Sequence, residues 1–384
     1  MTELKFKGFR RDDGRVGVRN YVGVVSTVFC SSSVAQKIAS STGANVFIHD
    51  GGCGQLGLSK EHTERILTGV VKHPNIGGVL TVGVGCEQID AESLANNTVG
   101  KPHEHLDIQD EGGNTKSIEK GIMLVRKIQK EMKQITRTSA DVSELAVATQ
   151  CGSSDTGSGI ASNPTVGAMA DMLIADGGAV ILGETGSLYG AAGLMARKAA
   201  SPEIGAEIIA MTDRLENYYS RIGHSLRNAN PTPGNIEAGL TTLVEKSLGG
   251  VRKGGTTPIQ GVLKPGETIV GKGLWVMDTS LGLGACASAD MLASGAQILV
   301  YTTGKGNPVG SPLGPVIKVT ATRKSVDTLG DIIDFDGSAV LTGKETIEAC
   351  ALRLYGKLLD VANGERVKSE IHDHNIFAIG KIAF

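Results

Sequence analysis

Three segments of the chain repeat one pattern, and this repeat constrains the fold more than any other feature. They run from Tyr21 to Asp50, from Leu145 to Glu184 and from Leu274 to Gly304. Each reads as a short apolar strand, a glycine- or serine-rich turn with a nearby cysteine, a small-residue helix and a second strand. Short β-branched strands that alternate with helices predict βαβ units in a parallel sheet. We therefore predict an α/β fold with Rossmann-like parallel sheets built from three repeated βαβ units.

A boundary between two domains is predicted near residue 140. From Ser117 to Arg137 apolar residues recur at helical spacing with lysines on the other face, which indicates an amphipathic helix. Residues 1–140 would form an N-terminal α/β domain. Residues 141–384 would form a C-terminal α/β domain that contains the two further βαβ units.

Composition excludes several classes of protein. The 384 residues carry a formal net charge of -2, so no electrostatic feature favours nucleic acid or an anionic membrane as a partner. No apolar run approaches the roughly 18 residues of a membrane span. The first residues are polar and charged, and the six cysteines are too widely spread for a disulfide framework. These features predict a cytoplasmic protein.

Metal-competent side chains follow several of the predicted strands. The carboxyl ends of parallel strands meet at one edge of a sheet, where ligands bind. Thiolate, imidazole and carboxylate groups there could hold a divalent ion with an open position, and three cysteines could equally hold an iron–sulfur cluster. The predicted metal ligands are His49, Cys53, Cys86, Glu87 and Cys151. The other cysteines, Cys30, Cys286 and Cys350, are interpreted as small packed hydrophobes, and His62, His372 and His374 as surface residues.

Charged residues beside glycines form a second group of candidates. Glu184 ends an apolar strand and could act as an acid, a base or a ligand; Lys246 and Lys305 lie in glycine-rich loops that could bind anions. We predict Glu184, Lys246 and Lys305 as catalytic, and the base could be Glu184, Lys305 or His49. No Walker loop or complete GxGxxG fingerprint occurs, which argues against a dinucleotide enzyme.

Substrate-binding residues are predicted on two segments. An arginine-rich stretch before the first strand could recognise a carboxylate bidentately, or it could be an internally paired surface loop. Polar residues that follow Cys151 are the second source. The predicted substrate-binding residues are Arg15, Arg19, Asn20, Ser153 and Asp155.

With these residues identified, the chain resembles the altronate/galactarate dehydratase family over nearly its whole length. The motifs that carry the resemblance are GFRRDDGRVGVRNYV, HDGGCGQ, HPNIGGVLTVGVGCE, CGSSDTGSGIASNPTVG, GNIEAGLTTLVEKSLGGVRKGG, GLWVMDTS and TTGKGNPVGSPLGPVIKV. The resemblance implies a metal-dependent hydro-lyase that dehydrates a sugar acid such as altronate or a related aldonate or aldarate. It also implies Fe²⁺ or another divalent metal such as Mn²⁺. The large subunit of sulfolactate sulfo-lyase resembles the same family and eliminates sulfite from a sulfonated hydroxy acid.

Two departures from the family pattern leave the substrate open. Single-chain members carry an N-terminal β-rich module of the SAF type, whereas here the signature starts at residue 8, which implies a separate small SAF-type subunit and an oligomeric assembly. The segment after MDT also differs, and Lys305 replaces an arginine of the family loop. A sulfo-lyase large subunit that acts on sulfolactate, and a non-catalytic subunit of a two-chain lyase, are therefore the alternatives.

Overall fold

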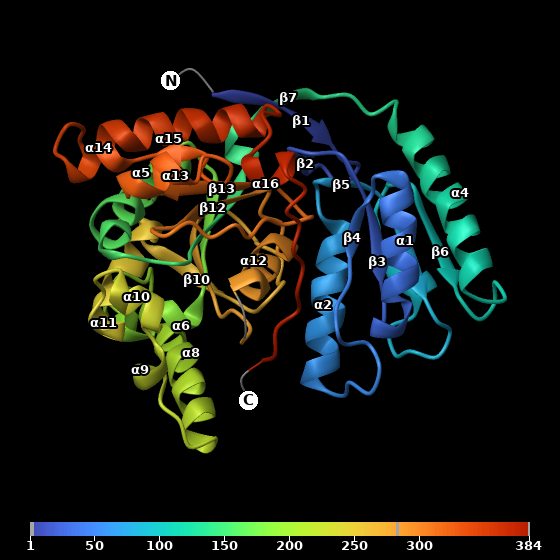
Figure 1. The fold of residues 1–384 in the computed structure, drawn as a ribbon, viewed down its shortest axis with the longest axis horizontal. Helices are drawn as coiled ribbons and strands as arrows, with labels where there is room; N and C mark the ends of the chain where they lie inside the picture. The colour runs from blue at the N-terminus through green and yellow to red at the C-terminus, as the bar shows by residue number, and fades with distance from the viewer. Residues whose placement is uncertain (1–3, 282–283, 383–384) are drawn as a thin grey trace.

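Two parallel β-sheets, each flanked by helices, organise the chain in the computed structural model, which describes residues 4–281 and 284–382. Figure 1 shows them as two lobes side by side, the N-terminal lobe in blue to teal and the C-terminal lobe in green to red. The predicted α/β architecture with parallel sheets is confirmed. No helix in the described ranges is long and apolar enough to cross a membrane.

The N-terminal lobe contains a four-stranded parallel sheet. Its strands, in spatial order, are β4 (Asn45–Phe47), β3 (Tyr21–Ser26), β5 (Ile76–Gly83) and β6 (His103–Asp107). Its helices are α1 (Ser32–Thr42), α2 (Leu58–Lys72), α3 (Ala91–Asn96) and α4 (Asn114–Met132). Helix α4 is the predicted amphipathic helix, and it buries Val125, Ile128 and Met132 along one face.

The C-terminal lobe contains a seven-stranded parallel sheet. Its strands, in spatial order, are β10 (Ile259–Leu263), β11 (Gly273–Met277), β9 (Ala179–Leu182), β8 (Ala146–Cys151), β12 (Ile298–Thr302), β13 (Val316–Thr320) and β14 (Phe335–Asp336). Strand β9 lies next to β8 on one side, and β12, which comes later in the chain, lies next to β8 on the other side. Open parallel sheets bind ligands at the carboxyl ends of the strands where the order reverses. Cys151, the last residue of β8, lies at that point.

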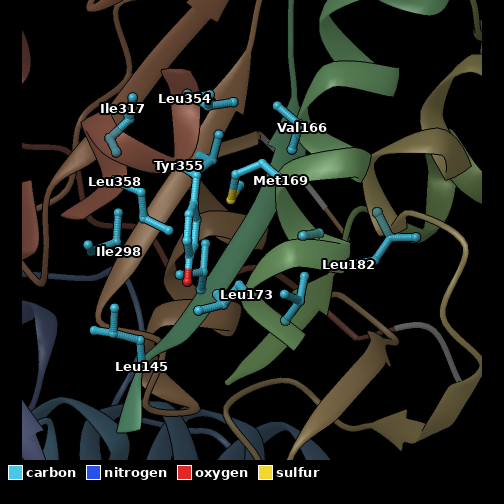
Figure 2. Close-up of a cluster of buried hydrophobic side chains, with 14 of the residues drawn as sticks. Leu145, Val166, Met169, Leu173, Leu182, Ile298, Ile317, Leu354, Tyr355 and Leu358 are labelled. Atoms are coloured by element: carbon cyan, nitrogen blue, oxygen red, sulfur yellow. The ribbon is translucent and has the colours of Figure 1, made fainter. Parts of the chain in front are cut away.

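Helices cover both faces of the large sheet, so its strands are apolar almost throughout. The helices of this lobe are α5 (Asn163–Ala175), α6 (Thr185–Leu188), α7 (Ala192–Arg197), α8 (Pro202–Arg221), α9 (Leu226–Ala229), α10 (Pro233–Glu237), α11 (Leu243–Gly250), α12 (Gly284–Ala293), α13 (Arg323–Thr328), α14 (Ser338–Leu341), α15 (Ile347–Ala362) and α16 (Lys368–Ile371). A short helical turn, η1 (Phe29–Ser31), precedes α1 in the N-terminal lobe. The other short helical turns are η2 (Val142–Glu144), the π-helical η3 (Ser158–Ser162), η4 (Tyr189–Ala191) and η5 (Val251–Gly254). Figure 2 shows the main core, where Val166 and Met169 of α5 face Leu354 and Tyr355 of α15.

The three repeated segments do not fold identically. In the first two, β3–α1–β4 and β8–α5–β9, the paired strands are parallel neighbours. In the third, β11 and β12 are parallel members of one sheet, but β9 and β8 lie between them. The cysteines also differ: Cys30 lies in η1 and is exposed, Cys151 ends β8, and Cys286 is buried in α12. The repeated pattern therefore identifies strands and helices correctly without making the three segments equivalent.

The two lobes share packed surfaces. Ile66 and Val70 of α2 belong to the same buried cluster as Met291 and Leu292 of α12. A Cβ atom added at Gly69 would lie only 2.3 Å from the Ala293 carbonyl oxygen, so glycine permits this close approach of the two helices.

Strand and tail segments also join the lobes. Strand β1 (Lys5–Arg10) pairs antiparallel with β2 (Val16–Gly17) and with β7 (Thr138–Asp141). The C-terminal segment runs between the lobes in Figure 1. Its Phe377 ring packs edge-on against the Phe47 ring, with the ring centroids 5.2 Å apart. The C-terminal segment thus packs against the N-terminal lobe.

Candidate active site

Three neighbouring cavities lie near the carboxyl ends of the parallel strands. The interlobe cavity has a volume of about 710 Å³, and His49, Cys53 and Cys286 contribute to its wall. The Glu184 cavity, of about 290 Å³, shares Leu281 with the first. The Cys151 cavity, of about 120 Å³, shares Lys246 with the second. Residues predicted from distant parts of the sequence, such as His49, Glu184 and Cys151, therefore line adjoining cavities.

Glu184 has an unusual backbone conformation. It follows β9 and adopts φ +75°, in the left-handed region where a residue with a side chain is strained. The next residue fixes this turn, because the Thr185 N–H donates to Thr279 Oγ1 at 3.0 Å and the Thr279 N–H donates to Thr185 Oγ1 at 2.9 Å. Strained residues that neighbouring contacts hold in place are concentrated at functional sites.

The chemical environment of Glu184 suits proton transfer. The Cys151 thiol donates to Glu184 Oε2 at 3.5 Å, and Lys253 Nζ donates to Cys151 Sγ at 3.1 Å. Burial raises the pKa of the Glu184 carboxyl, while the charges of Lys253 and Lys246 act in the opposite direction. Carboxyl groups that act as general acids or bases usually face a cavity and have a raised pKa.

Lys246 lies in the wall between the Glu184 and Cys151 cavities. Its ammonium group donates to Asn230 Oδ1 at 2.7 Å and to Asn235 Oδ1 at 3.1 Å. Both partners are neutral amides, so they orient the ammonium group without neutralising its charge. This arrangement suits recognition of an anionic group in the Glu184 cavity.

The Lys305 side chain lies outside the walls of the three cavities. It forms an ion pair with Glu237 at 2.7 Å, and its side chain is 47% exposed and that of Glu237 is 77% exposed. It is not among the residues that line the three cavities. Lys305 therefore lies against α10, the helix that also carries Asn235, the partner of Lys246, and its backbone N–H donates to the Ser153 carbonyl at 3.1 Å, but its side chain does not line the Glu184 cavity.

The segment after Cys151 shapes the wall of the cavity. Ser153 adopts φ +52°, a second strained residue near Cys151. Asp155 lines the Cys151 cavity, but its Oδ1 accepts hydrogen bonds from the Ser158 N–H and hydroxyl, both at 2.7 Å, and its Oδ2 accepts one from Thr322. Asp155 thus anchors the start of η3, and its carboxylate is already engaged by the protein.

The predicted arginine site lies at the opposite end of the strands. Arg15 and Arg19 precede β3, whereas ligands gather after the strands. Arg15 pairs with Asp13 at 2.6 Å, and Arg19 forms a buried ion pair with Glu370 at 2.6 Å. Asn20 Oδ1 accepts a hydrogen bond from Arg11 at 2.9 Å. These residues are internally paired, but Arg19 is buried rather than part of a surface loop, and the structure does not bring them to the cavities.

The predicted metal ligands do not converge in this structure. The His49 Nε2–H donates to the Ser26 carbonyl at 3.1 Å, while its Nδ1 accepts the Gly51 N–H at 3.1 Å, and burial lowers its pKa. Cys53 and Cys86 are exposed on neighbouring loops, and Cys151 belongs to the other lobe. Over residues 4–281 and 284–382, no group of three or more His, Cys, Asp or Glu side chains is arranged to hold a metal ion.

Glu87 is also committed to protein contacts. Its carboxylate accepts hydrogen bonds from Thr27 Oγ1 at 2.7 Å and from the backbone N–H groups of Gly85 and Cys86 at 2.9 and 3.0 Å. Partial burial acts to raise the pKa of Glu87, but these and neighbouring hydrogen bonds hold it below the ordinary value. The donor atoms as placed do not fit a metal centre, so we derive no catalytic step through a metal.

Some expectations about single residues are wrong. His62 is buried rather than superficial: only 2% is exposed, its Nε2–H donates to the Gly380 carbonyl at 3.1 Å, and burial lowers its pKa to about 4. Its position four residues before Ile66 on the apolar side of α2 was the signal that pointed to the core. Cys30 is exposed rather than packed, while Cys286 and Cys350 are buried as expected.

Lys253 was not predicted as a site residue. The sequence shows only a lysine among glycines in a long loop. The structure buries it completely beside Cys151. Its role depends on the contact between η5 and β8, which no local pattern encodes.

Family models match both lobes. Residues 8–133 match "D-galactarate dehydratase/Altronate hydrolase, second domain", and residues 142–384 match "D-galactarate/Altronate dehydratase, C-terminal". The chain belongs to the D-galactarate/altronate dehydratase family. As a member, it is an enzyme of the lyase class.

Individual relatives agree with this assignment. Altronate dehydratase of Bacillus subtilis is 34% identical over 98% of this chain and 77% of its own length. Galactarate dehydratase of Escherichia coli is 32% identical over 94% of this chain and 73% of its own length. The β subunit of (2R)-sulfolactate sulfo-lyase of Chromohalobacter salexigens is 36% identical and matches 99% of both chains.

Proposed function

We propose that this enzyme dehydrates a sugar acid of the altronate or galactarate type, with Glu184 as the group that transfers the proton. The observation that carries the proposal is the strained, partly buried Glu184 carboxyl in one cavity with the Lys246 ammonium group. The names of the dehydratase relatives support the substrate class.

The polarity of the Glu184 cavity supports a polyhydroxylated substrate. Hydroxyl and amide side chains dominate the polar part of its wall, and groups of this kind can exchange hydrogen bonds with several substrate hydroxyls. They are Thr185, Ser187, Asn230, Thr232, Thr279 and Ser280. Sulfolactate offers a single hydroxyl as a donor, because its sulfonate and carboxylate oxygens only accept hydrogen bonds, so it would leave more of the acceptor atoms in this wall without a partner.

The proposed reaction is a β-elimination. Glu184 removes the proton at the carbon next to the carboxylate; the electron pair of that C–H bond forms the new double bond, and the hydroxyl on the following carbon takes the proton back from Glu184 and leaves as water. The resulting enol then rearranges to a 2-oxo acid. Lys246 would hold the carboxylate, where negative charge accumulates as the C–H bond breaks.

Further features implied by the family resemblance remain proposals. They are a divalent metal such as Fe²⁺ or Mn²⁺, or a three-cysteine iron–sulfur cluster; a separate small SAF-type subunit within an oligomer; and a cytoplasmic location. Metal analysis of the chain purified without oxygen, before and after iron is added, tests the first. Mass measurement of the native assembly tests the second.

The second candidate function is that of a sulfo-lyase subunit. It is favoured by the match to the sulfo-lyase β subunit over 99% of both chains, and that relative's name denotes a multi-subunit enzyme. In this reaction sulfite would leave in place of water. A non-catalytic role in a two-chain lyase is the third alternative, and the cavity around Glu184 and Lys246 argues against it.

A substrate panel separates these functions. The purified chain is incubated without oxygen with altronate, galactarate or (2R)-sulfolactate, with and without Fe²⁺ or Mn²⁺. The 2-oxo acid is measured as its semicarbazone and sulfite by a thiol-exchange dye. We expect a 2-oxo acid from a sugar acid and no sulfite. Release of sulfite from sulfolactate, with both sugar acids inert, would contradict the proposal and support the second function.

A further inference from the structure

Lys253 is a buried lysine beside the proposed catalytic carboxyl. It lies in η5, has 0% exposure, and donates hydrogen bonds to the Gly250 carbonyl at 2.9 Å and to Cys151 Sγ at 3.1 Å. The Cys151 thiol in turn donates to Glu184 Oε2 at 3.5 Å. Lys253, Cys151 and Glu184 thus form a continuous chain of contacts, which we name the Lys253 relay, from the protein interior to the Glu184 cavity.

The segment that carries Lys253 is fixed on both sides. A Cβ atom added at Gly167 of α5 would lie 2.0 Å from the Arg252 carbonyl oxygen, so η5 packs directly on this helix. Lys198 Nζ donates to the carbonyls of Gly254 and Gly255 at 3.1 and 2.5 Å. Such contacts on both sides leave Lys253 little freedom to move away from Cys151.

Electrostatics gives this arrangement a reason. An ammonium group that is buried without a compensating charge is strongly destabilising. Glu184 supplies the opposite charge. The charges of Lys253 and Lys246 both act to lower the pKa of its carboxyl. Tyr301 is also close: a Cβ atom added at Gly152 would lie 2.0 Å from its hydroxyl oxygen. Lys253, Lys246 and Tyr301 therefore all lie close enough to Glu184 to interact electrostatically with its carboxyl.

We infer that Lys253 is a positioning residue for the proposed elimination: through Cys151 it holds the Glu184 carboxyl in the orientation that faces the substrate. The inference rests on the proposed function of Glu184. Lys253 itself is completely buried and does not reach substrate, so its removal should impair turnover rather than binding.

The first test compares two buried lysines. Lys253→Met removes the ammonium group of the relay. Lys101→Met removes another buried ammonium group, in the N-terminal lobe, where Nζ donates to the carbonyls of Val71 and His73 at 3.1 and 2.8 Å. Misplacement of a reacting group can reduce turnover about 100-fold. We expect Lys253→Met to lower kcat by about this factor with KM within about twofold, while Lys101→Met changes neither.

A double-mutant cycle separates positioning from a general structural role. If Lys253 acts through Glu184, Lys253→Met should change kcat by less than about twofold when it is added to Glu184→Gln, because residues that act as a unit are not additive. A further loss of about 100-fold in that background would overturn the inference. So would wild-type kcat in Lys253→Met alone.

A second variant covers the case in which Lys253→Met does not fold. Cys151→Ala removes the sulfur that joins Lys253 to Glu184 and leaves both charged groups in place. We expect the same loss of kcat at unchanged KM, and wild-type kcat would overturn the inference. Failure of this inference can be distinguished from failure of the proposed function. Full activity of Glu184→Gln would refute Glu184 as the proton-transfer group, whatever the result for Lys253.

Discussion

Replacement of Asp290 by asparagine should change how stability depends on pH. Asp290 lies in α12, is fully buried, and its Oδ2 accepts hydrogen bonds from the Ser280 N–H and hydroxyl, both at 2.7 Å. Its Oδ1 has no hydrogen-bond partner within the described part of the chain. Burial raises the pKa of this carboxyl from 3.8 to about 7, although its bonds to Ser280 and the charge of Arg65 act to lower it.

The magnitude follows from this pKa. The folded chain binds the Asp290 proton more tightly than the unfolded chain. Protonation of Asp290 therefore contributes fully to the free energy of unfolding below about pH 4, and this contribution is lost as pH rises to about 7. A difference of roughly 3 pH units corresponds to about 4 kcal/mol. An asparagine side chain at this position would not ionise and would keep an oxygen that accepts from Ser280. Asp290→Asn should therefore match the wild type near pH 4 and exceed its free energy of unfolding by up to about 4 kcal/mol at pH 8.

Urea denaturation followed by circular dichroism at pH 4.5, 6 and 8 measures this difference. Asp360→Asn is the matched control, because Asp360 is exposed on α15 and its substitution should leave the free energy of unfolding at pH 8 close to that of the wild type. If Asp290→Asn were no more stable than the wild type at pH 8 while the control behaves as expected, the argument from burial would be refuted.

Two further substitutions test the packing between the lobes. The pKa of His62 falls from 6.5 to about 4 in the folded chain, so the free energy of unfolding should decrease as pH falls between these values. Glutamine does not ionise, so His62→Gln should remove about 3 kcal/mol of that decrease. Thermal melts between pH 7 and pH 4 measure the difference. Gly69→Val should lower the free energy of unfolding by about 1–3 kcal/mol because its side chain would meet the Ala293 carbonyl. Gly356→Ala in α15, where an added Cβ meets nothing within 4 Å, should not destabilise the chain, and an equal loss in both glycine variants would contradict the packing argument.

Much of the architecture could be predicted because local patterns determine it. The apolar spacing of α4 and the short β-branched strands required no knowledge of the rest of the chain. The separation of β11 from β12 could not be predicted, because both an adjacent and a distant parallel strand satisfy the same strand–helix–strand pattern. His62 shows the opposite case: residue type suggested the surface, whereas its place on the apolar side of α2 required burial.

The candidate site was predictable where strand ends marked it. Glu184 and Cys151 directly follow apolar runs, and the structure brings their side chains to 3.5 Å. Arg19 has the residue type of an anion site, but its partner Glu370 is 351 positions away and could not be inferred from spacing. Lys305 lies in a promising glycine loop, yet its side chain turns to an exposed partner. Tertiary pairing of charges, rather than local motif, decides which of these residues reach the cavities.

Turnover of a sugar acid by Glu184→Gln tests the central claim most directly. Loss of a general acid–base group typically lowers the rate by about 10²–10⁴-fold, so we expect kcat to fall by this factor while the variant melts at the wild-type temperature. Lys127→Met is the matched control, and it should keep kcat within about twofold because its exposed ion pair with Glu104 lies on the N-terminal lobe outside the cavities. Wild-type turnover by Glu184→Gln, or an equal loss in Lys127→Met, would contradict the account.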